Sequence, residues 1–286
     1  MPAAASSRLK LIGAMVIFGT IGIFRKYIPL DSSLIAMVRG GVGTLFLLLV
    51  MLLSRSRLDR PAIRKNLVKL VVSGAAIGFN WILLFESYRY TTVATATLCY
   101  YMAPIFVMLL SPIVLHQRLT LRKTVCVIIA LAGMVLVSGV LESGGTGFKG
   151  ILLGLGAAAL YASVILTNQF IRNIPAYDKT ILQLGSATVV LLPYVLLTVD
   201  FSAQTATPLA LVMLLIVGII HTGVAYWLYF GSMKDLPAQT IALLSYLDPV
   251  GAILLSALFL GEPMTLLTGV GAVLVLGATA YSELKT

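Results

Sequence analysis

The sequence predicts an all-α membrane protein with ten transmembrane helices in two inverted five-helix repeats. Three observations lead to this prediction. The chain of 286 residues is 59% hydrophobic and only 10% charged, with a mean hydropathy of +1.03, whereas a soluble domain is about 25% charged. Its apolar residues form long runs that charged or turn residues separate, and part of the first half recurs in the second. This composition excludes a soluble globular fold and a disordered chain.

Ten apolar runs are candidates for crossing a bilayer, at about 20 apolar residues per helix. In chain order, the predicted spans are Leu9–Phe24, Ser32–Ser54, Leu67–Ser87, Thr91–Leu115, Val125–Leu141, Gly150–Phe170, Leu182–Leu197, Leu209–Phe230, Ala238–Leu260 and Leu266–Tyr281. The runs are continuously apolar, unlike the alternating strands of a membrane barrel. The first run has no convincing cleavage site, and Arg25 and Lys26 follow it directly, so we interpret it as an uncleaved span rather than a signal peptide.

The distribution of basic residues predicts the orientation of the chain. With the N-terminus inside, the inner segments carry 15 Lys and Arg residues and the outer segments carry 4. Because loops rich in Lys and Arg stay in the cytoplasm, we expect both termini to be cytoplasmic and the protein to lie in the inner (plasma) membrane. The same bias accounts for the net charge of +10, so the expected partner is the lipid bilayer and not a nucleic acid.

An internal repeat divides the chain into residues 1–145 and 146–286. Sliding the chain by 145 residues aligns Ile77–Thr120 with Thr222–Thr265 without a gap, and 13 of these 44 positions are identical. Each half holds five predicted spans, an odd number, so the second half must enter the membrane in the opposite orientation. Inverted repeats are the architecture of many secondary transporters that work by alternating access. The alternative is an old duplication without a mechanistic role.

The repeated segments carry a family resemblance. The first is Tyr101-Met-Ala-Pro104-Ile-Phe-Val, and the second half echoes it with Tyr246-Leu-Asp-Pro249-Val, followed by Leu260-Gly-Glu-Pro-Met-Thr265. The chain resembles the ten-span EamA-type members of the drug/metabolite transporter superfamily, and is similar to YddG-type exporters of aromatic and other neutral amino acids. The first half departs from the pattern at His116-Gln117-Arg118. The resemblance implies a central cavity lined largely by spans 1, 3, 4, 6, 8 and 9.

Three titratable residues lie at membrane depth, where such groups are costly and usually face a cavity or a partner. Asp248 could attract a substrate ammonium or bind a coupling proton, or it could only fix helix packing. Arg39 could meet a substrate carboxylate with two hydrogen bonds, although a structural pair is the stronger interpretation. His221 could shuttle protons, but a neutral hydrogen-bonded histidine is favoured. Glu86 is expected to be solvated near the outer surface.

Aromatic and amide side chains complete the predicted substrate-binding site. Its candidates are Asn80, Trp81, Tyr100, Tyr101, Tyr161, Asn168, His221, Trp227, Tyr246 and Asp248. Such a lining offers an amphipathic solute apolar faces with a few polar tips, although helix packing is the simpler explanation for any single residue. Tyr88 and Tyr90 are attributed to an interfacial aromatic belt. Pro104 and Pro249 occupy equivalent mid-span positions and are predicted to kink their helices as hinges.

Several chemistries are missing from the sequence. There is no His-Glu-x-x-His motif, no phosphate-binding loop and no cysteine cluster, and the chain has only two histidines. We therefore expect no catalytic residues, no metal and no cofactor, and transport that does not hydrolyse ATP. The predicted function is export of small metabolites, most notably neutral or aromatic amino acids, by a monomer. The alternatives are another solute class, namely a sugar, nucleotide sugar or drug, and, from a different class, an intramembrane enzyme.

Overall fold

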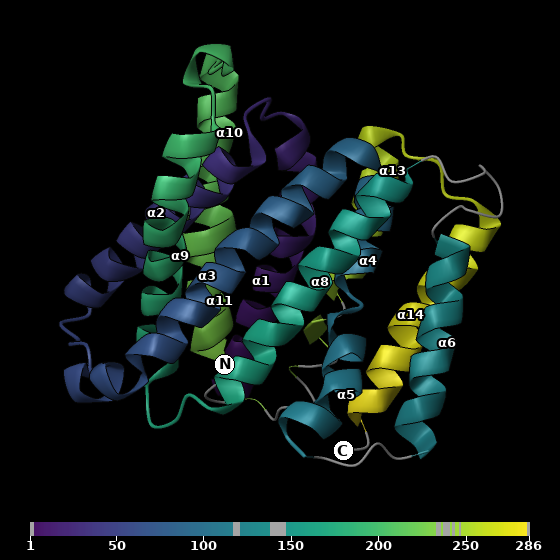
Figure 1. Ribbon diagram of the computed structural model, residues 1–286, viewed down its shortest axis with the longest axis horizontal. Helices are drawn as coiled ribbons and strands as arrows, with labels where there is room; N and C mark the ends of the chain where they lie inside the picture. Colours follow the sequence, from purple (N-terminus) through teal and green to yellow (C-terminus); the bar gives the residue numbers. More distant parts are fainter. Residues whose placement is uncertain are drawn as a thin grey trace.

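The computed structural model describes residues 3–116, 121–137, 147–232, 236, 241, 244–245 and 247–284, and its regular elements are all helices (Figure 1). They are α1 (Ala3–Lys26), α2 (Ser32–Leu53), α3 (Arg60–Tyr90), α4 (Val93–Tyr100), α5 (Ala103–Val114), α6 (Leu121–Val137), α8 (Phe148–Gln169), α9 (Ala176–Thr198), the 3-10 turn η1 (Phe201–Ala203), α10 (Pro208–Gly218), the π-helical turn η2 (Ile219–Val224), α11 (Ala225–Ser232), α13 (Leu247–Leu260) and α14 (Leu266–Leu284).

Polar residues at the helix starts explain where several apolar runs become helical. The Asp31 side chain accepts a hydrogen bond from the backbone amide of Ser33 at the start of α2, and Asp59 caps α3 in the same way. Thr92 caps α4, and Thr207 caps α10 immediately before Pro208. Such residues accept hydrogen bonds from amides that the first helical turn leaves unpaired. The helices therefore begin at positions that the sequence marks.

The described helices include seven that are long and apolar enough to cross a membrane, and three shorter apolar ones. Two of the seven are composite, because α4 and α5 together form one candidate span and α10, η2 and α11 form another. The shorter helices are Thr124–Val137, Leu247–Leu260 and Leu266–Ala278. The predicted fifth and ninth spans each extend into residues outside the described ranges. The model thus shows an all-helical membrane protein, and the count of ten spans stays a prediction.

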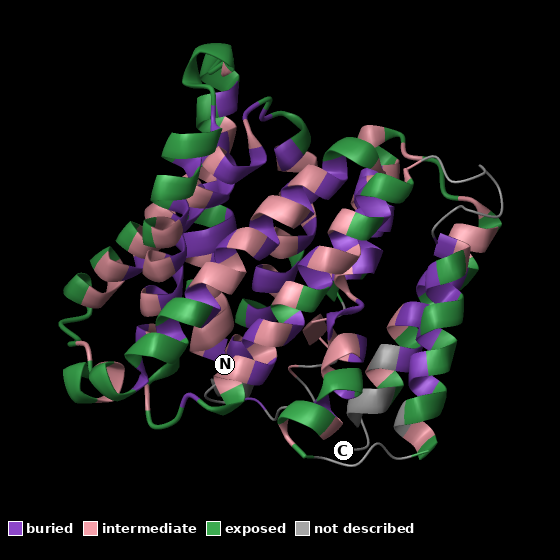
Figure 2. Ribbon diagram, in the orientation of Figure 1, coloured by how far each residue is buried: buried purple, intermediate pink, exposed green. Residues whose placement is uncertain are grey.

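The exposed surface of the helices is apolar, as a bilayer requires. Leu53, Val68, Leu197 and Leu266 are each at least three-quarters exposed, a pattern that would make a soluble protein aggregate. In Figure 2 the buried parts of the ribbon lie toward the inside of the bundle, whereas the outer faces are exposed. The molecule therefore presents hydrophobic side chains outward around a packed interior.

The packing of the helices brings the two halves of the chain together. In Figure 1 α6 and α14 lie side by side at one edge of the molecule, and α3 packs against both α8 and α9. Helix α1 contacts α11 and α13, and α2 contacts α9 and η2. The α6–α14 pair is close because a Cβ on Gly133 would lie 2.8 Å from the backbone oxygen of Gly271, so only glycine permits this approach.

Candidate functional site

A cavity of about 470 Å³ lies between the two halves of the chain. Its lining comes from α1, α2, α3, α4, α5, α8, α11 and α13. The lining residues are Met15, Phe18, Gly19, Ile21, Gly22, Arg39, Trp81, Leu84, Tyr88, Thr97, Tyr100, Tyr101, Ala103, Pro104, Tyr161, Tyr226, Tyr229, Ile241, Ser245, Asp248 and Ala252. This volume suits a small metabolite. The helices match those that the family resemblance implied, with α2 in addition.

Arg39 is the cation of this cavity. Its side chain is buried, and its Nε donates a hydrogen bond of 2.8 Å to the hydroxyl of Thr222. The guanidinium lies 4.1 Å from the ring centre of Trp81 and 5.5 Å from that of Phe85. These cation–π contacts stabilise the buried charge. No carboxylate of the described residues lies within ion-pair distance of Arg39. Within this part of the chain, the bonded structural partner of Arg39 is the Thr222 hydroxyl and not an acid.

Asp248 is the anion of the cavity and lies in the first turn of α13. The hydroxyl of Tyr101 donates a hydrogen bond of 2.6 Å to its Oδ2. A single tyrosine hydroxyl satisfies only part of a carboxylate, which can accept about four hydrogen bonds. The backbone of α1 approaches closely here, because a Cβ on Gly19 would lie 2.8 Å from the Asp248 carbonyl oxygen.

Aromatic rings form much of the remaining wall. The rings of Tyr100 and Tyr161 are stacked with centres 5.3 Å apart, and Tyr101 meets Tyr100 edge-on. On the other side, Phe18 packs edge-on against Tyr226, with ring centres 5.4 Å apart. These rings supply apolar faces and hydroxyl tips within one cavity. The arrangement can hold an amphipathic solute that carries charged groups of both signs.

A break between α4 and α5 brings the two adjacent tyrosines to the cavity. Helix α4 ends at Tyr100, α5 begins at Ala103, and Pro104 stands in the first turn of α5. Proline fits this position because the first turn needs no amide donor there. The predicted kink at Pro104 is therefore a helix break. Pro249 occupies the first turn of α13, but Tyr246 lies outside the described residues, so the kink predicted there stays a prediction.

The structure gathers only some of the predicted site residues. Those that line the cavity are Arg39, Trp81, Tyr100, Tyr101, Tyr161, Pro104 and Asp248. Asn80 lies behind them, since the hydroxyl of Tyr100 is 3.5 Å from its Oδ1 and its own amide donates to the carbonyl of Ala157. His221 is buried outside the lining, with its Nε2 2.9 Å from the Thr20 hydroxyl.

Two predicted residues lie elsewhere in the structure. Asn168 accepts a hydrogen bond of 2.8 Å from the side-chain amide of Gln183 and is not part of the cavity lining. Trp227 is 41% exposed on α11 and also lies outside the lining. Membrane depth alone therefore does not place a side chain in the cavity, because the helix face decides which way it points. Tyr246, the remaining candidate, lies outside the described residues.

The sequence analysis attributed Tyr88 to the aromatic belt, and this interpretation is wrong. Tyr88 is only 3% exposed and lines the cavity. The signal was its spacing of seven residues from Trp81, which places both on one face of α3. Tyr226 and Tyr229 were also missed as cavity residues, although their spacing of three puts them on one face of α11.

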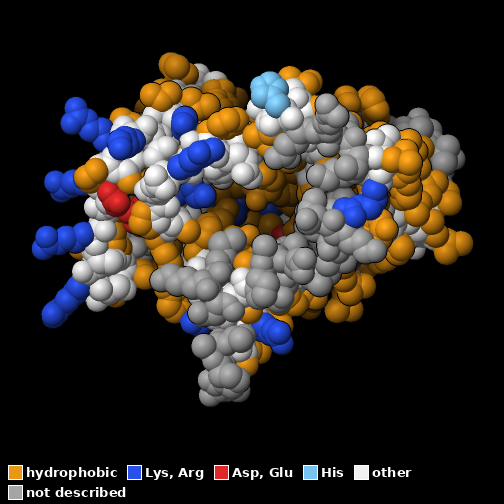
Figure 3. Space-filling view, turned by 90° about the horizontal axis from the view of Figure 1, so that it is seen from below, with side chains coloured by type: hydrophobic (Ala, Val, Ile, Leu, Met, Phe, Trp, Pro, Cys, Tyr) orange, Lys and Arg blue, Asp and Glu red, His pale blue; other side chains and the backbone are white. Residues whose placement is uncertain are grey.

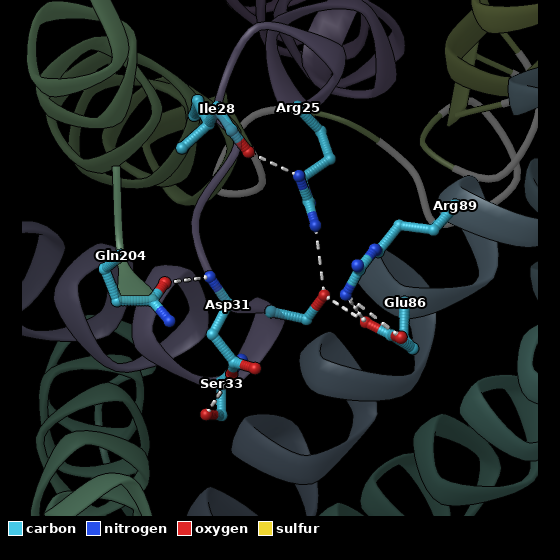
Figure 4. A network of polar contacts seen from close by, with 8 residues as sticks. Arg25, Ile28, Asp31, Ser33, Glu86, Arg89 and Gln204 are labelled. Atoms are coloured by element: carbon cyan, nitrogen blue, oxygen red, sulfur yellow. Dashed lines mark hydrogen bonds and ion pairs between the residues drawn. The ribbon is translucent and has the colours of Figure 1, made fainter. Parts of the chain in front are cut away.

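A polar network joins the far end of α1 to α2 and α3 (Figure 4). The guanidinium of Arg25 donates to the Ile28 carbonyl oxygen at 2.6 Å and to the Ser32 hydroxyl at 3.1 Å. Ser32 in turn donates to Glu86 at 2.7 Å, and Glu86 forms an ion pair of 3.3 Å with Arg89. The expectation that Glu86 is merely solvated is therefore wrong, because two neighbouring groups bind its carboxylate.

Two further contacts at this end connect the first half to the second. The carboxylate of Glu262, between α13 and α14, accepts hydrogen bonds from the amides of Val93 at 2.8 Å and Ala94 at 3.2 Å. A carboxylate at a helix start is favoured because it meets free amides and the positive end of the helix dipole. The side chain of Gln204 accepts from the amide of Asp31 at 2.8 Å, as Figure 4 shows.

The opposite end of the molecule is hollowed. Figure 3 shows this lower face with a depression at its centre whose walls are mainly hydrophobic, and with Lys and Arg side chains gathered at one side. Exposed basic residues surround the connection between α2 and α3, among them Arg55, Arg57, Arg60, Arg64 and Lys65. The N and C marks in Figure 1 also lie toward this face.

A second cavity, of about 580 Å³, lies between α6 and α14. Its walls are almost entirely aliphatic, with Arg122 and Tyr281 as polar exceptions. It does not combine charges of opposite sign, and it lies between the paired helices at the edge of the bundle. The central cavity is therefore the candidate site.

The helices and the central cavity define a multi-pass membrane protein with a solute-sized binding site. The model of the EamA-like transporter family matches the chain twice, over residues 6–139 and 148–282. The chain belongs to the EamA-like transporter family, and the family and its similar relatives are transporters, which agrees with the prediction that it is not an enzyme.

Similar proteins cover nearly the whole chain. It is 31% identical over 283 residues to the uncharacterized transporter YxxF of Bacillus subtilis, which covers 97% of this chain and 89% of that protein. An uncharacterized transporter of Archaeoglobus fulgidus is 26% identical over 267 residues, 93% of this chain and 92% of its own length. A protein of known crystal structure with 19% identity has the same fold, with a TM-score of 0.64 over 98% of this chain and 97% of its own.

Proposed function

We propose that this transporter exports neutral or aromatic amino acids across the inner membrane by alternating access. One observation carries the proposal: a cation, Arg39, and an anion, Asp248, line the same aromatic-walled cavity. The planar guanidinium suits a carboxylate, and the carboxylate suits an ammonium group. An α-amino acid presents both groups on one carbon and adds a side chain that the aromatic wall can cover.

Hydrogen bonding in the cavity is consistent with this assignment. Within the described residues, Arg39 has only its Nε bonded to a neighbour, so its two terminal nitrogens are available for a carboxylate. In the part of the chain that the structure describes, Asp248 has one bonded partner, the Tyr101 hydroxyl, and keeps acceptor capacity for an ammonium group. Both contacts would be charge-assisted hydrogen bonds, which are about twice as strong as bonds between neutral groups.

Two inverted halves, residues 1–145 and 146–286, are part of the proposal. The sequence repeat and the double match of the family model support them. So does the order of helix contacts. If each span is exchanged with its counterpart in the other half, the contact between α3 and α8 corresponds to the contact between α11 and α1. In the same way, the contact between α5 and α8, of the fourth and sixth spans, corresponds to that between α13 and α1, of the ninth and first. Two contacts join a helix directly to its own counterpart in the other half, namely α2 to α9 and α6 to α14. Exchange of this kind is what a two-fold relation between two five-helix units produces.

We propose that this structure is one of the two states of the transport cycle. The hollow of the lower face (Figure 3) is taken as the mouth of the cavity, and the polar contacts around Arg25 and Glu262 as the closed opposite end. The basic residues at the hollow end support a cytoplasmic location of that face and of both termini. The cavity then opens to the cytoplasm, the side from which an exporter takes up its substrate. Both halves come from one chain, so a monomer suffices.

Counterflow in proteoliposomes tests the proposed function. Vesicles loaded with phenylalanine should accumulate external labelled phenylalanine, with competition from other neutral amino acids. Phenethylamine, which lacks the carboxylate, and N-acetylphenylalanine, which lacks the ammonium group, should compete poorly. Trp227→Phe, outside the cavity, is the matched control and should retain full exchange. Absence of exchange for every amino acid tested would refute the proposal and favour a sugar, nucleotide sugar or drug as substrate.

A further inference from the structure

The composite span Pro208–Ser232 contains a π-helical turn, Ile219–Val224, at its centre. A π-helical turn accommodates one extra residue and frequently occurs at a functional site. Here the side chains of the turn bond to carbonyl groups five residues earlier. The hydroxyl of Thr222 donates to the carbonyl oxygen of Val217 at 3.0 Å, and Nδ1 of His221 lies 3.4 Å from that of Ile216.

Helix α2 lies directly against this turn, and glycines on both sides permit the approach. A Cβ on Gly43 would overlap with Cγ2 of Thr222. A Cβ on Gly218 would lie 2.7 Å from Val42, and one on Gly223 would lie 2.6 Å from Phe46. Each glycine therefore leaves room for a side chain of the facing element, and the side chains of Thr222, Val42 and Phe46 fill these spaces.

This packing fixes the direction of the Thr222 hydroxyl. Its single proton goes to the carbonyl oxygen of Val217, so the oxygen turns its lone pairs to Nε of Arg39 at 2.8 Å. The face of the guanidinium is covered by Trp81 at 4.1 Å. One edge and one face of the cation are therefore engaged by the protein, and the edge with the two terminal nitrogens is left for a ligand.

We propose that Thr222 is a positioning residue for the substrate carboxylate: the π-helical turn presents its hydroxyl to Nε of Arg39 and so aims the two terminal nitrogens into the cavity. The inference rests on the proposed function in taking the ligand to be a carboxylate. The preference for a ligand with a carboxylate over one without it is then set by a residue that does not itself touch the ligand.

Replacement of Thr222 by Val keeps the shape and removes the hydroxyl. The bond between Thr222 and Arg39 is present with and without substrate, so its loss lowers affinity only through the ordering of the freed guanidinium on binding. Ordering one such side chain corresponds to about a 2- to 10-fold change in affinity, and phenylalanine binding should weaken by this factor in Thr222→Val. Binding of phenethylamine, without the carboxylate, should stay unchanged. Thr222→Ser restores the hydroxyl and should restore phenylalanine binding. Thr188→Val is the matched control, because Thr188 also contacts α2 at Gly40 and donates its hydroxyl to a carbonyl of its own helix, at Leu184. Unlike Thr222, it does not accept the Nε hydrogen bond of Arg39.

Trp81 provides a readout that needs no substrate. The chain has two tryptophans, so Trp227→Phe leaves Trp81 as the single reporter beside Arg39. In this background Thr222→Val should shift the Trp81 emission, because the guanidinium over the ring is no longer held, whereas Thr222→Ser and Thr188→Val should not.

The two readouts separate the possible failures. If wild type binds no amino acid but Thr222→Val still shifts the Trp81 emission, the proposed substrate is wrong and the positioning of Arg39 stands. If wild type binds phenylalanine and Thr222→Val binds it equally well with unchanged emission, the positioning role is refuted. Equal losses for phenylalanine and phenethylamine, or an equal loss in Thr188→Val, would also refute it, since they indicate a general effect on folding.

Discussion

Replacement of Asp248 by Asn tests the anionic half of the site with little change in shape. The amide oxygen can still accept the hydrogen bond that the Tyr101 hydroxyl now gives to Oδ2 at 2.6 Å. The contact between the tyrosine and α13 is therefore retained, and only the charge is removed. Any effect on recognition then reports the charge and not the packing of the helix.

The size of the effect follows from the bond that is lost. A hydrogen bond between charged partners contributes about 1.5–3 kcal/mol, which corresponds to about a 10- to 100-fold change in Kd. Binding of phenylalanine should weaken by this factor in Asp248→Asn. Binding of N-acetylphenylalanine, which has no ammonium group, should not weaken. The preference between the two ligands is therefore the diagnostic quantity.

Competition in the counterflow assay measures that preference for purified protein. Asp178→Asn is the matched control, because Asp178 is a buried aspartate that accepts from the backbone amide of Asp59 and lies outside the cavity lining. It should leave the preference unchanged. An Asp248→Asn protein that unfolds at the wild-type temperature and keeps the wild-type preference would refute the assignment of an ammonium site to Asp248.

Three further predictions concern the central cavity, its closed end and the packing of α6 on α14. Arg39→Lys keeps the charge but loses the planar donor set, so the affinity for phenylalanine should fall about tenfold or more in the counterflow assay; wild-type affinity would contradict a paired contact with the carboxylate. Glu262→Ala removes the acceptor of the Val93 and Ala94 amides at the closed end of the cavity. In a Thr97→Cys background, an impermeant thiol reagent added on the side of Glu262 should therefore label position 97 faster with Glu262→Ala than without it. Equal rates would contradict a role of Glu262 in closing the cavity. Gly133→Ala places a Cβ 2.8 Å from a backbone oxygen and should cost about 1–3 kcal/mol, lowering the unfolding temperature in detergent, whereas Gly277→Ala, with no heavy atom within 4 Å, should not; equal temperatures would contradict tight packing of α6 on α14.

The sequence predicted those helices that local chemistry delimits. The second span was predicted as Ser32–Ser54, and α2 runs from Ser32 to Leu53. An N-capping aspartate precedes this run and Arg55 follows it, so the boundaries are visible in the residues themselves. The position of the break at Pro104 was likewise visible, because proline marks its own effect on a helix.

Features that depend on packing were not visible in the sequence. The sequence of the π-helical turn, IIHTGV, contains no proline or other local mark of a helix irregularity. The turn lies where three glycines let α2 approach. One additional residue in a turn rotates all later residues of the span by about 100°. The rotation sets which face of α11 meets the cavity: Tyr226 and Tyr229 line it, whereas the adjacent Trp227, predicted on depth alone, is 41% exposed.

The depth of a side chain near a helix end was misjudged for a similar reason. Tyr88 stands close to the end of α3, where an interfacial residue is expected. The amino group of Lys26, at the end of α1, donates to the carbonyl oxygen of Tyr88 at 2.8 Å and holds α1 over this position. The same end of α1 contributes Arg25 to the network at Glu86. Burial at these residues comes from a neighbouring helix, which the local sequence does not specify.

The two charges of the cavity break the internal repeat in opposite ways, and this bears on how a substrate could drive the transport cycle. With the offset of 145 residues, the counterpart of Asp248 is Ala103 and the counterpart of Arg39 is Leu184. Helices α2 and α9, which carry Arg39 and Leu184, begin 144 and end 145 residues apart (176 − 32 and 198 − 53). The first half therefore contributes only the cation and the second half only the anion.

A ligand with one charge can satisfy one half of such a cavity, whereas a zwitterion can bind both halves at once. Its binding energy then acts on both halves together. A ligand shifts the populations of the two transport states only if it binds one state better than the other. On this reasoning both charges are needed for substrate-driven exchange, even where one suffices for binding. We therefore expect phenethylamine to be bound weakly and not exchanged, and its rapid counterflow would contradict the coupling of the two halves through a zwitterion.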